Sequence, residues 1–263
     1  SKNDVEKKYS GIAYKTVISN GLVLDKNGNK MSKRLGNVVD PFATIYKYGA
    51  DATRWYFISN ASPWDNLRFD VSGTEEVQRK FFGTLSNTYQ FFVLYANVDN
   101  FTFKEKYIPV HDRPEIDQWI LSALNSLIRK VVKAFDEYEP TIAARAIEYF
   151  TTEDLSNWYV RLCRRRFWKG DYEQDKIAAY QTLYECLETI LKLMAPVSPF
   201  FPDEIFSILN SVTNLSPVSS IHHTDFPKAN ISAIDENLEE RMQMAQDICS
   251  LILSIRKKAG IKV

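Results

Sequence analysis

The sequence predicts a mainly α protein in which a helical bundle follows a small α/β segment. Beyond about residue 70, apolar side chains recur every three or four positions through long stretches, the spacing that places them on one face of a helix. Before residue 40, short runs of β-forming residues alternate with glycine-containing turns. Helices with one apolar stripe bury it against one another, so a bundle is the expected architecture.

The composition is that of a globular protein with no overall charge. Of the 263 residues 45% are hydrophobic, and 33 basic residues balance 33 acidic ones. No global field favours nucleic acid, so a site for a polyanion must be a local patch. The three cysteines lie far apart in helical patterns, which favours reduced thiols over disulfides or a zinc site. The sequence shows neither a long apolar run nor a signal peptide, and we expect a cytoplasmic protein without a membrane span.

The first 40 residues hold the β-forming runs. Residues 13–18 and 22–24 read as extended segments. Asn27-Gly28 then favours a tight turn, because glycine adopts positive φ without strain. Asp40 and Pro41 open a helix, with the aspartate as N-cap and the proline in the first turn.

Amphipathic helices account for most of the remaining chain. The apolar spacing predicts helices over about 73–97, 116–135, 141–169, 180–194, 199–210 and 237–258. Pro140 and Pro196 stop two of them, since proline cannot continue a helix. The run from Thr151 to Asp154 reads either as an interruption of the third helix or as a cap. Residues 100–114 carry prolines and charges and are the expected domain boundary.

The pentapeptide Lys30-Met31-Ser32-Lys33-Arg34 is the strongest functional signal. Two lysines three positions apart, with a small hydroxyl residue between them, place two ammonium groups on one loop. Such a pair is suited to hold a polyphosphate while negative charge builds on it. Gly28 and Gly36 flank the run, which suits a loop that closes over a nucleotide. The alternative is a solvated basic turn after a hairpin.

The third predicted helix carries a second set of candidate residues. At 100° per residue, four polar or aromatic side chains fall on one outward stripe: Asn157, Arg161, Arg164 and Trp168. Four others point toward the bundle: Leu155, Trp158, Tyr159 and Leu162. Amide, guanidinium and indole groups grip phosphates, bond to base edges and stack on unpaired bases. From the spacing alone, two interpretations of this stripe are equally favoured: a surface that contacts RNA, and a basic helix face that is only solvated. Three basic residues of the preceding helix are weaker candidates for the same RNA-binding groove: Arg129, Lys130 and Lys133.

The lysine pentapeptide resembles the KMSKS signature of class I aminoacyl-tRNA synthetases, with Arg34 where most members carry serine. Residues 20–25 and Asp40-Pro41 are similar to the subgroup for isoleucine, valine, leucine and methionine. Residues 62–69 and 156–161 resemble the isoleucine-specific members most closely, and the valine-specific members are the nearest alternative. The resemblance covers about residues 13–263, whereas residues 1–12 match nothing that we can place and read as residues added artificially to the natural chain.

This resemblance implies roles for the residues of both sites. Lys30 and Lys33 would be catalytic, neutralising the pyrophosphate that leaves ATP, and Met31, Ser32 and Lys33 would contact the nucleotide. ATP with Mg²⁺ and isoleucine would be substrates of the whole enzyme, and the fragment itself is expected to bind no metal. The outward stripe on the third helix would contact tRNA-Ile, because this region corresponds to the anticodon-binding bundle. We expect a monomer.

The resemblance also divides the chain into four regions. These are a catalytic-domain remnant with the lysine loop over 1–40, a helical stem-contact region over 41–105, the anticodon-binding bundle over 106–225, and a helix leading toward a missing C-terminal segment over 226–263. The second ATP signature of the class, HIGH, is absent, and so is its editing domain. His111, His222 and His223 are interpreted as a loop residue and a polar pair. We therefore expect a C-terminal piece that forms no aminoacyl-adenylate alone. The alternative from another class is a non-catalytic helical RNA-binding module.

Overall fold

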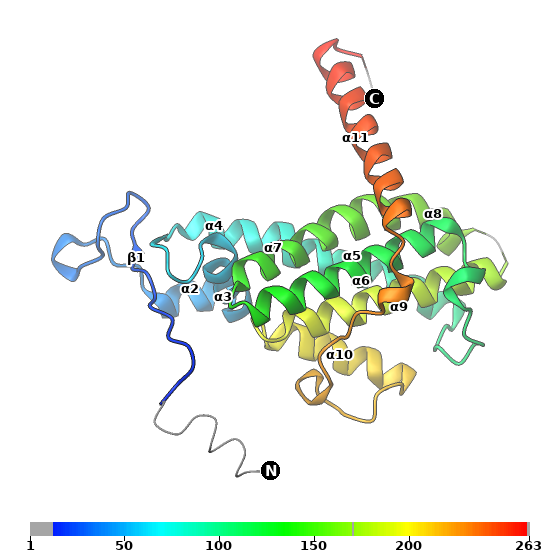
Figure 1. Cartoon of the computed structure of the whole chain (residues 1–263), viewed down its shortest axis with the longest axis horizontal. Coiled ribbons are helices and arrows are strands. Elements are labelled where there is room, and N and C mark those ends of the chain that lie inside the picture. The colour runs from blue at the N-terminus through cyan, green and yellow to red at the C-terminus, as the bar shows by residue number, and fades with distance from the viewer. Residues whose placement is uncertain (1–12, 170, 262–263) are drawn as a thin grey trace.

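Packed helices form an elongated body in the computed structural model, which describes residues 13–169 and 171–261. The segment around β1 (Val23–Leu24) lies at one end of the body, and α8 (Arg161–Trp168) lies toward the other (Figure 1). The remaining α-helices are α2 (Pro41–Tyr48), α3 (Ala50–Asn60), α4 (Val71–Val77), α5 (Gly83–Asp99), α6 (Glu115–Asp136), α7 (Pro140–Tyr149), α9 (Gln174–Met194), α10 (Phe200–Thr213) and α11 (Glu236–Lys258). The predicted fold class, mainly α with a small α/β segment, is confirmed.

Short elements complete the chain. π-Helical segments continue α-helices without a break: η2 (Gln78–Phe82) joins α4 to α5, and η4 (Phe150–Val160) joins α7 to α8. Short 3-10 turns lie in loops of the described residues: η1 (Lys33–Leu35), η3 (Val110–Asp112), η5 (Ile221–His223) and η6 (Ile231–Ala233). The helix start predicted at Asp40 is confirmed, because its side chain accepts hydrogen bonds from the amides of Phe42 and Ala43.

A two-stranded parallel sheet holds the segment that precedes the lysine loop. β1 pairs with β2 (Leu67–Arg68), with Val23 opposite Leu67 and Leu24 opposite Arg68. Two residues of the extended run predicted over 22–24, Val23 and Leu24, form a strand, whereas residues 13–18 belong to no strand in the described part of the chain. This small sheet is the β part of the α/β segment.

One apolar core runs through the helices from Ala52 to Leu238. It is rich in aromatic contacts, such as the stacked rings of Trp55 and Phe81, whose centroids are 4.6 Å apart. The core also includes the segment between α5 and α6, where Phe101 stacks on Tyr180 at 4.9 Å. The expected boundary over 100–114 is thus packed against α9, and the division into four regions stays a prediction.

The third predicted helix is continuous from α7 through η4 to α8, so the run from Thr151 to Asp154 neither interrupts nor caps it. Its fully or nearly fully buried side chains recur every four residues: Thr151, Leu155, Tyr159, Cys163 and Phe167. An α-helix of 3.6 residues per turn drifts away from such a spacing, and the wider turns of a π-helix compensate for that drift. The prediction that Leu162 faces the bundle is wrong, because its side chain is 55% exposed.

The last helix, α11, projects from the side of the body (Figure 1). Only Leu238 and Gln246 of this helix are buried. The apolar side chains in its second half, among them Ile248, Ile252 and Ile255, are largely exposed. None of the helices in the described part of the chain is long and apolar enough to cross a membrane.

Candidate phosphate loop and RNA-facing helix

The turn before the lysine loop is organised by Asp25, which immediately follows β1. Its Oδ1 accepts hydrogen bonds from the backbone amides of Asn27 at 3.0 Å and Asn29 at 2.8 Å. Its Oδ2 accepts from Asn37 Nδ2 at 2.9 Å. The hydrogen bond from Asn37 is the main cause that lowers the pKa of Asp25, so this carboxyl group is a carboxylate at neutral pH.

The signature itself folds into a tight, exposed loop. Lys30 pairs with Leu24 in an isolated antiparallel β-bridge. The Ser32 hydroxyl caps η1 by accepting a hydrogen bond from the Leu35 amide at 3.2 Å. Gly36 ends the turn at φ 65°, a left-handed conformation that favours glycine. Met31 is half-buried against the small apolar cluster that contains Tyr56. The signature thus forms a short capped turn, and Met31 anchors this turn to the small apolar cluster.

The two lysines are free to meet an anion. Lys30 and Lys33 are both exposed, and no carboxylate within residues 13–169 or 171–261 forms an ion pair with either of them. A polyphosphate that approaches this loop would therefore meet two uncompensated ammonium groups. The structure places Met31 and Ser32 between them, as the sequence requires, and the role of these four residues toward ATP stays a prediction.

The loop is tied to the helical body through the segment between α3 and β2. Gly21 N–H donates to the Pro63 carbonyl at 2.9 Å, and Leu22 N–H donates to Asn66 Oδ1 at 2.8 Å. A Cβ on Gly21 would lie 2.1 Å from the carbonyl oxygen of Asp65, so only glycine fits there. The strand before the lysines is therefore held in place by the loop after α3.

The outward stripe of the third predicted helix is exposed at all four positions. Asn157 lies in η4, while Arg161, Arg164 and Trp168 lie on α8. Asn157 Nδ2 donates to Glu153 Oε2 at 3.0 Å, one turn earlier. The structure thus presents an amide, two guanidinium groups and an indole to solvent along one helix, and their contact with RNA stays a prediction.

A groove of about 680 Å³ separates this helix from α11, and we call it the α8–α11 groove. Trp158 and Leu162 line one side, with Ile252 and Leu253 on the other. Polar side chains also line it, among them Asn157, Arg161 and Arg256. Sequence spacing assigned Leu162 to the core and therefore missed this apolar surface beside the arginines. Arg164 and Trp168 lie outside the groove.

Three other basic residues, which belong to α6 and α8, lie away from the exposed stripe. Arg166, one of the run of arginines on α8, turns inward and pairs with the buried Asp117 at 2.6 Å. Arg129 and Lys133 line a different groove, formed with Phe226 and Pro227. They are therefore not part of the α8–α11 groove.

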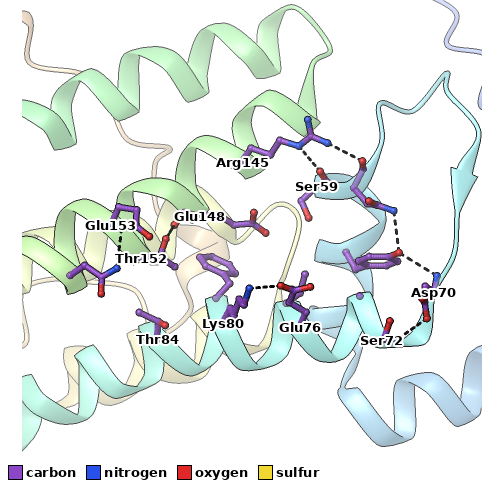
Figure 2. A pocket seen from close by; sticks show the side chains of 16 residues that line it. Ser59, Asp70, Ser72, Glu76, Lys80, Thr84, Arg145, Glu148, Thr152 and Glu153 are labelled. Carbon is purple, nitrogen blue, oxygen red and sulfur yellow. Dashed lines mark hydrogen bonds and ion pairs between the residues drawn. The ribbon is translucent and has the colours of Figure 1, made fainter. Parts of the chain in front are cut away.

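A cleft of about 740 Å³ lies between α3 and α4 on one side and α7 and η4 on the other (Figure 2). Arg145 donates to the carbonyls of Ser59 at 2.7 Å and Asn60 at 2.9 Å, and Lys80 pairs with Glu76. Burial raises the pKa of Glu148, whose Oε1 accepts from the Trp55 indole at 2.6 Å. Both cations of this cleft, Arg145 and Lys80, already have partners within the protein. Because Arg145 and Glu148 of α7 bond to residues of α3, the cleft is the junction that fixes α7 to α3.

The histidines lie in loops and turns. His111 is 3.5 Å from Asp112, and His222 Nε2 is 2.9 Å from the Pro199 carbonyl. Neither contact resembles a nucleotide site. Groups of three or more side chains able to hold a metal do not occur among the described residues. The three cysteines are free thiols, with Cys163 and Cys186 buried.

Two family models match the chain. Residues 117–263 match the anticodon-binding domain of tRNA ligase, and residues 5–70 match tRNA synthetases class I (I, L, M and V). The expectation that residues 1–12 match nothing is therefore wrong from residue 5 onward. The chain is 61% identical over 255 residues to an isoleucine–tRNA ligase of Bacteroides thetaiotaomicron and 63% identical over 255 residues to one of Cytophaga hutchinsonii. These alignments cover 97% of this chain but 22% and 23% of the relatives. The chain thus spans less than a quarter of their length.

Among solved structures, the LeuRS of Agrobacterium radiobacter K84, in a ternary complex with tRNA and LeuAMS, superposes with a TM-score of 0.63. The match covers 82% of this chain and 24% of the LeuRS chain at 21% sequence identity. At that identity the likeness shows the fold alone. It agrees with a small α/β segment that leads into a helical bundle.

Proposed function

The chain belongs to the family of anticodon-binding domains of tRNA ligases, and on that premise we propose that it is part of an isoleucine–tRNA ligase. The observation that carries the proposal is identity above 60% to two isoleucine–tRNA ligases over 97% of the chain. In this proposal the chain contributes two things to the whole enzyme, a loop that stabilises the leaving pyrophosphate and a surface that binds the tRNA anticodon.

The first contribution is electrostatic. In amino-acid activation a carboxylate attacks the α-phosphate of ATP, and negative charge develops on the departing pyrophosphate. The exposed ammonium groups of Lys30 and Lys33 stabilise that charge, each by about 2–4 kcal/mol if they act like other preorganised donors. Ser32 shapes the loop, and the Met31 backbone lies near the adenine. Mg²⁺ arrives with ATP.

The second contribution is RNA binding by α8 and the end of η4. Arg161 and Arg164 bind phosphate oxygens, Asn157 bonds to a base edge, and Trp168 stacks on an unpaired base. The support is that all four side chains are exposed along one helix and that Asn157 and Arg161 line a groove. The partner in this proposal is tRNA-Ile.

The proposal assigns the steps of catalysis to the whole enzyme. The sequence holds no His-x-Gly-His run, so the second ATP signature of the class has no counterpart in this chain. We therefore propose that this chain forms no aminoacyl-adenylate alone. The four regions keep the boundaries expected from the sequence: 1–40, 41–105, 106–225 and 226–263.

Filter binding with tRNA-Ile and tRNA-Val tests the proposal. We expect tight binding of tRNA-Ile that weakens steeply as salt rises, because phosphate contacts release counterions. We expect weaker binding of tRNA-Val. Equal affinity for the two tRNAs would reduce the chain to a general RNA-binding module, and absence of binding at low salt would overturn the proposal.

A further inference from the structure

We infer that Asn37 is the positioning residue of the lysine loop, acting through Asp25 to fix the backbone at Lys30 and Ser32. The inference rests on the proposed function, because the groups that Asn37 positions are those assigned to ATP. Asn37 touches no substrate in this scheme. It determines where the ammonium groups stand before ATP arrives.

The contacts of one amide side chain carry the inference. Asn37 Oδ1 accepts from the Ser32 amide at 2.9 Å. Asn37 Nδ2 donates to Asp25 Oδ2 at 2.9 Å and to the Lys30 carbonyl at 3.3 Å. A single side chain thereby joins the two ends of the loop and ties both to the residue that follows β1.

The anchor of this amide, Asp25, is itself buried and hydrogen-bonded to the backbone. Asp25 is 8% exposed, and its Oδ1 is occupied by two backbone amides of the preceding turn. Its Oδ2 is left to receive the Asn37 amide. Because Asp25 is a carboxylate, this hydrogen bond is of the stronger, charge-assisted kind.

The geometry requires a side chain that donates and accepts at the same time. Asparagine offers a carbonyl oxygen and an NH₂ group on one short branch. An aspartate at this position would keep an acceptor for Ser32 N–H but would place a second carboxylate against Asp25. Like charges at hydrogen-bond distance repel, so the loop would detach from its anchor.

An exchange of the two side chains provides the decisive variant. Asn37→Asp alone opposes two carboxylates. The double variant Asp25→Asn with Asn37→Asp restores one donor and one acceptor across the same gap. Its new amide can keep Oδ1 for the two backbone N–H groups and donate from Nδ2, losing only the 3.3 Å contact to the Lys30 carbonyl. Asn20→Asp adds the same charge at an exposed asparagine and is the matched control.

The first measurement needs only this chain. Trypsin cleaves after Lys30, Lys33 and Arg34, and cleavage of a structured loop tracks the population of its open form. We expect Asn37→Asp to speed cleavage within the loop by about tenfold to a hundredfold, the effect of losing a hydrogen bond to a charged group. The double variant should return to within about threefold of the parent, and Asn20→Asp should not change the rate. An unchanged rate in Asn37→Asp, or no recovery in the double variant, would overturn the inference.

The second measurement separates this inference from the proposed function. In the whole ligase, Asn37→Asp should lower kcat of isoleucine-dependent ATP–pyrophosphate exchange with little change in KM for isoleucine, and the double variant should recover it. If cleavage responds as expected but exchange does not, Asn37 still positions the loop and the catalytic role of the loop fails. If exchange falls while cleavage is unchanged, the positioning role of Asn37 fails.

Discussion

Arg166 and Asp117 form an ion pair with two hydrogen bonds inside the bundle. Arg166 Nη1 donates to Asp117 Oδ1 at 2.6 Å, and Nη2 donates to Oδ2 at 2.8 Å. The Tyr159 hydroxyl also donates to Asp117 Oδ1 at 2.7 Å. The Asp117 side chain is fully buried and the Arg166 side chain is 15% exposed. The pair ties α8 to the start of α6.

Arg166→Met should therefore destabilise the chain. The substitution leaves a buried carboxylate without its charge partner, which costs about 3–5 kcal/mol of unfolding free energy. Urea denaturation followed by circular dichroism measures the loss. Arg165→Ala, at the exposed neighbour, is the control and should stay within about 0.5 kcal/mol of the parent. A loss below about 1 kcal/mol for Arg166→Met would mean that the pair contributes little.

The same pair shows that the burial of one arginine could not be predicted from the residues around it in the sequence. Arg164, Arg165 and Arg166 are adjacent and look alike in sequence, yet the first two are exposed and the third is mostly buried. The partner that selects Arg166 lies 49 residues away on another helix. Its selection therefore depends on tertiary packing rather than on spacing.

The bounds of the helices could be predicted from the sequence more accurately than which side chains of a helix are buried. The helix predicted over 116–135 spans Glu115–Asp136, because its apolar rhythm and the following Pro140 are local signals. The orientation of Leu162 was wrong because the turns of η4 are wider than those of an α-helix. For the lysine loop, the sequence identified the lysines but not Asn37, whose contacts exist only once the turn has formed.

The π-helical register makes a direct prediction about two leucines seven positions apart. Leu155 is fully buried, whereas Leu162 is 55% exposed. Leu155→Ala should lower the unfolding free energy by about 2–5 kcal/mol through lost burial and a cavity. Leu162→Ala should change it by about 0.5 kcal/mol or less. Thermal or urea unfolding of both variants measures the difference, and equal losses would contradict the register.

The attachment of α11 should depend on pH through Asp154. Burial raises the pKa of Asp154 to about 6, Gln246 opposes the shift by hydrogen bonding at 3.4 Å, and the nearby Glu153 and Glu239 add to it. Because the pKa of Asp154 in the folded chain lies above the ordinary value of an aspartate, the ionised side chain destabilises the fold as pH rises from about 4 to 6, and the penalty persists above 6. Its full size is about 3 kcal/mol at most.

Asp154→Asn removes this titration and tests it. The variant should be more stable than the parent at pH 7.5, and the gain should shrink by pH 5 as Asp154 binds its proton. Unfolding free energies from urea titrations at the two pH values give the comparison. Asp247→Asn, at an exposed carboxylate of α11, is the control. A gain that is equal at both pH values would contradict the assignment.

The proposed contact of the exposed η4–α8 stripe with RNA predicts a specific salt dependence. Arg161→Ala together with Arg164→Ala should weaken tRNA binding and should reduce the slope of log K against log salt by about 1–2, since each phosphate contact contributes slightly less than 1. Both side chains are exposed, so thermal unfolding should be unchanged. Arg129→Ala with Lys133→Ala, in the groove formed with Phe226, is the matched control. An unchanged dissociation constant for the first pair would remove α8 from the interface.

The proposed role of the lysine loop predicts a change in the rate of adenylate formation in the whole ligase. Lys33→Ala should slow adenylate formation by about 30-fold to 1,000-fold, the range that corresponds to 2–4 kcal/mol of charge stabilisation. The KM for isoleucine should change far less, because in the proposed role the lysine acts on charge that develops during the reaction. Lys26→Ala, at an exposed lysine in the turn before the loop, is the control. Single-turnover measurement of adenylate formation separates the two parameters, and an effect confined to KM would mean that Lys33 only docks substrate.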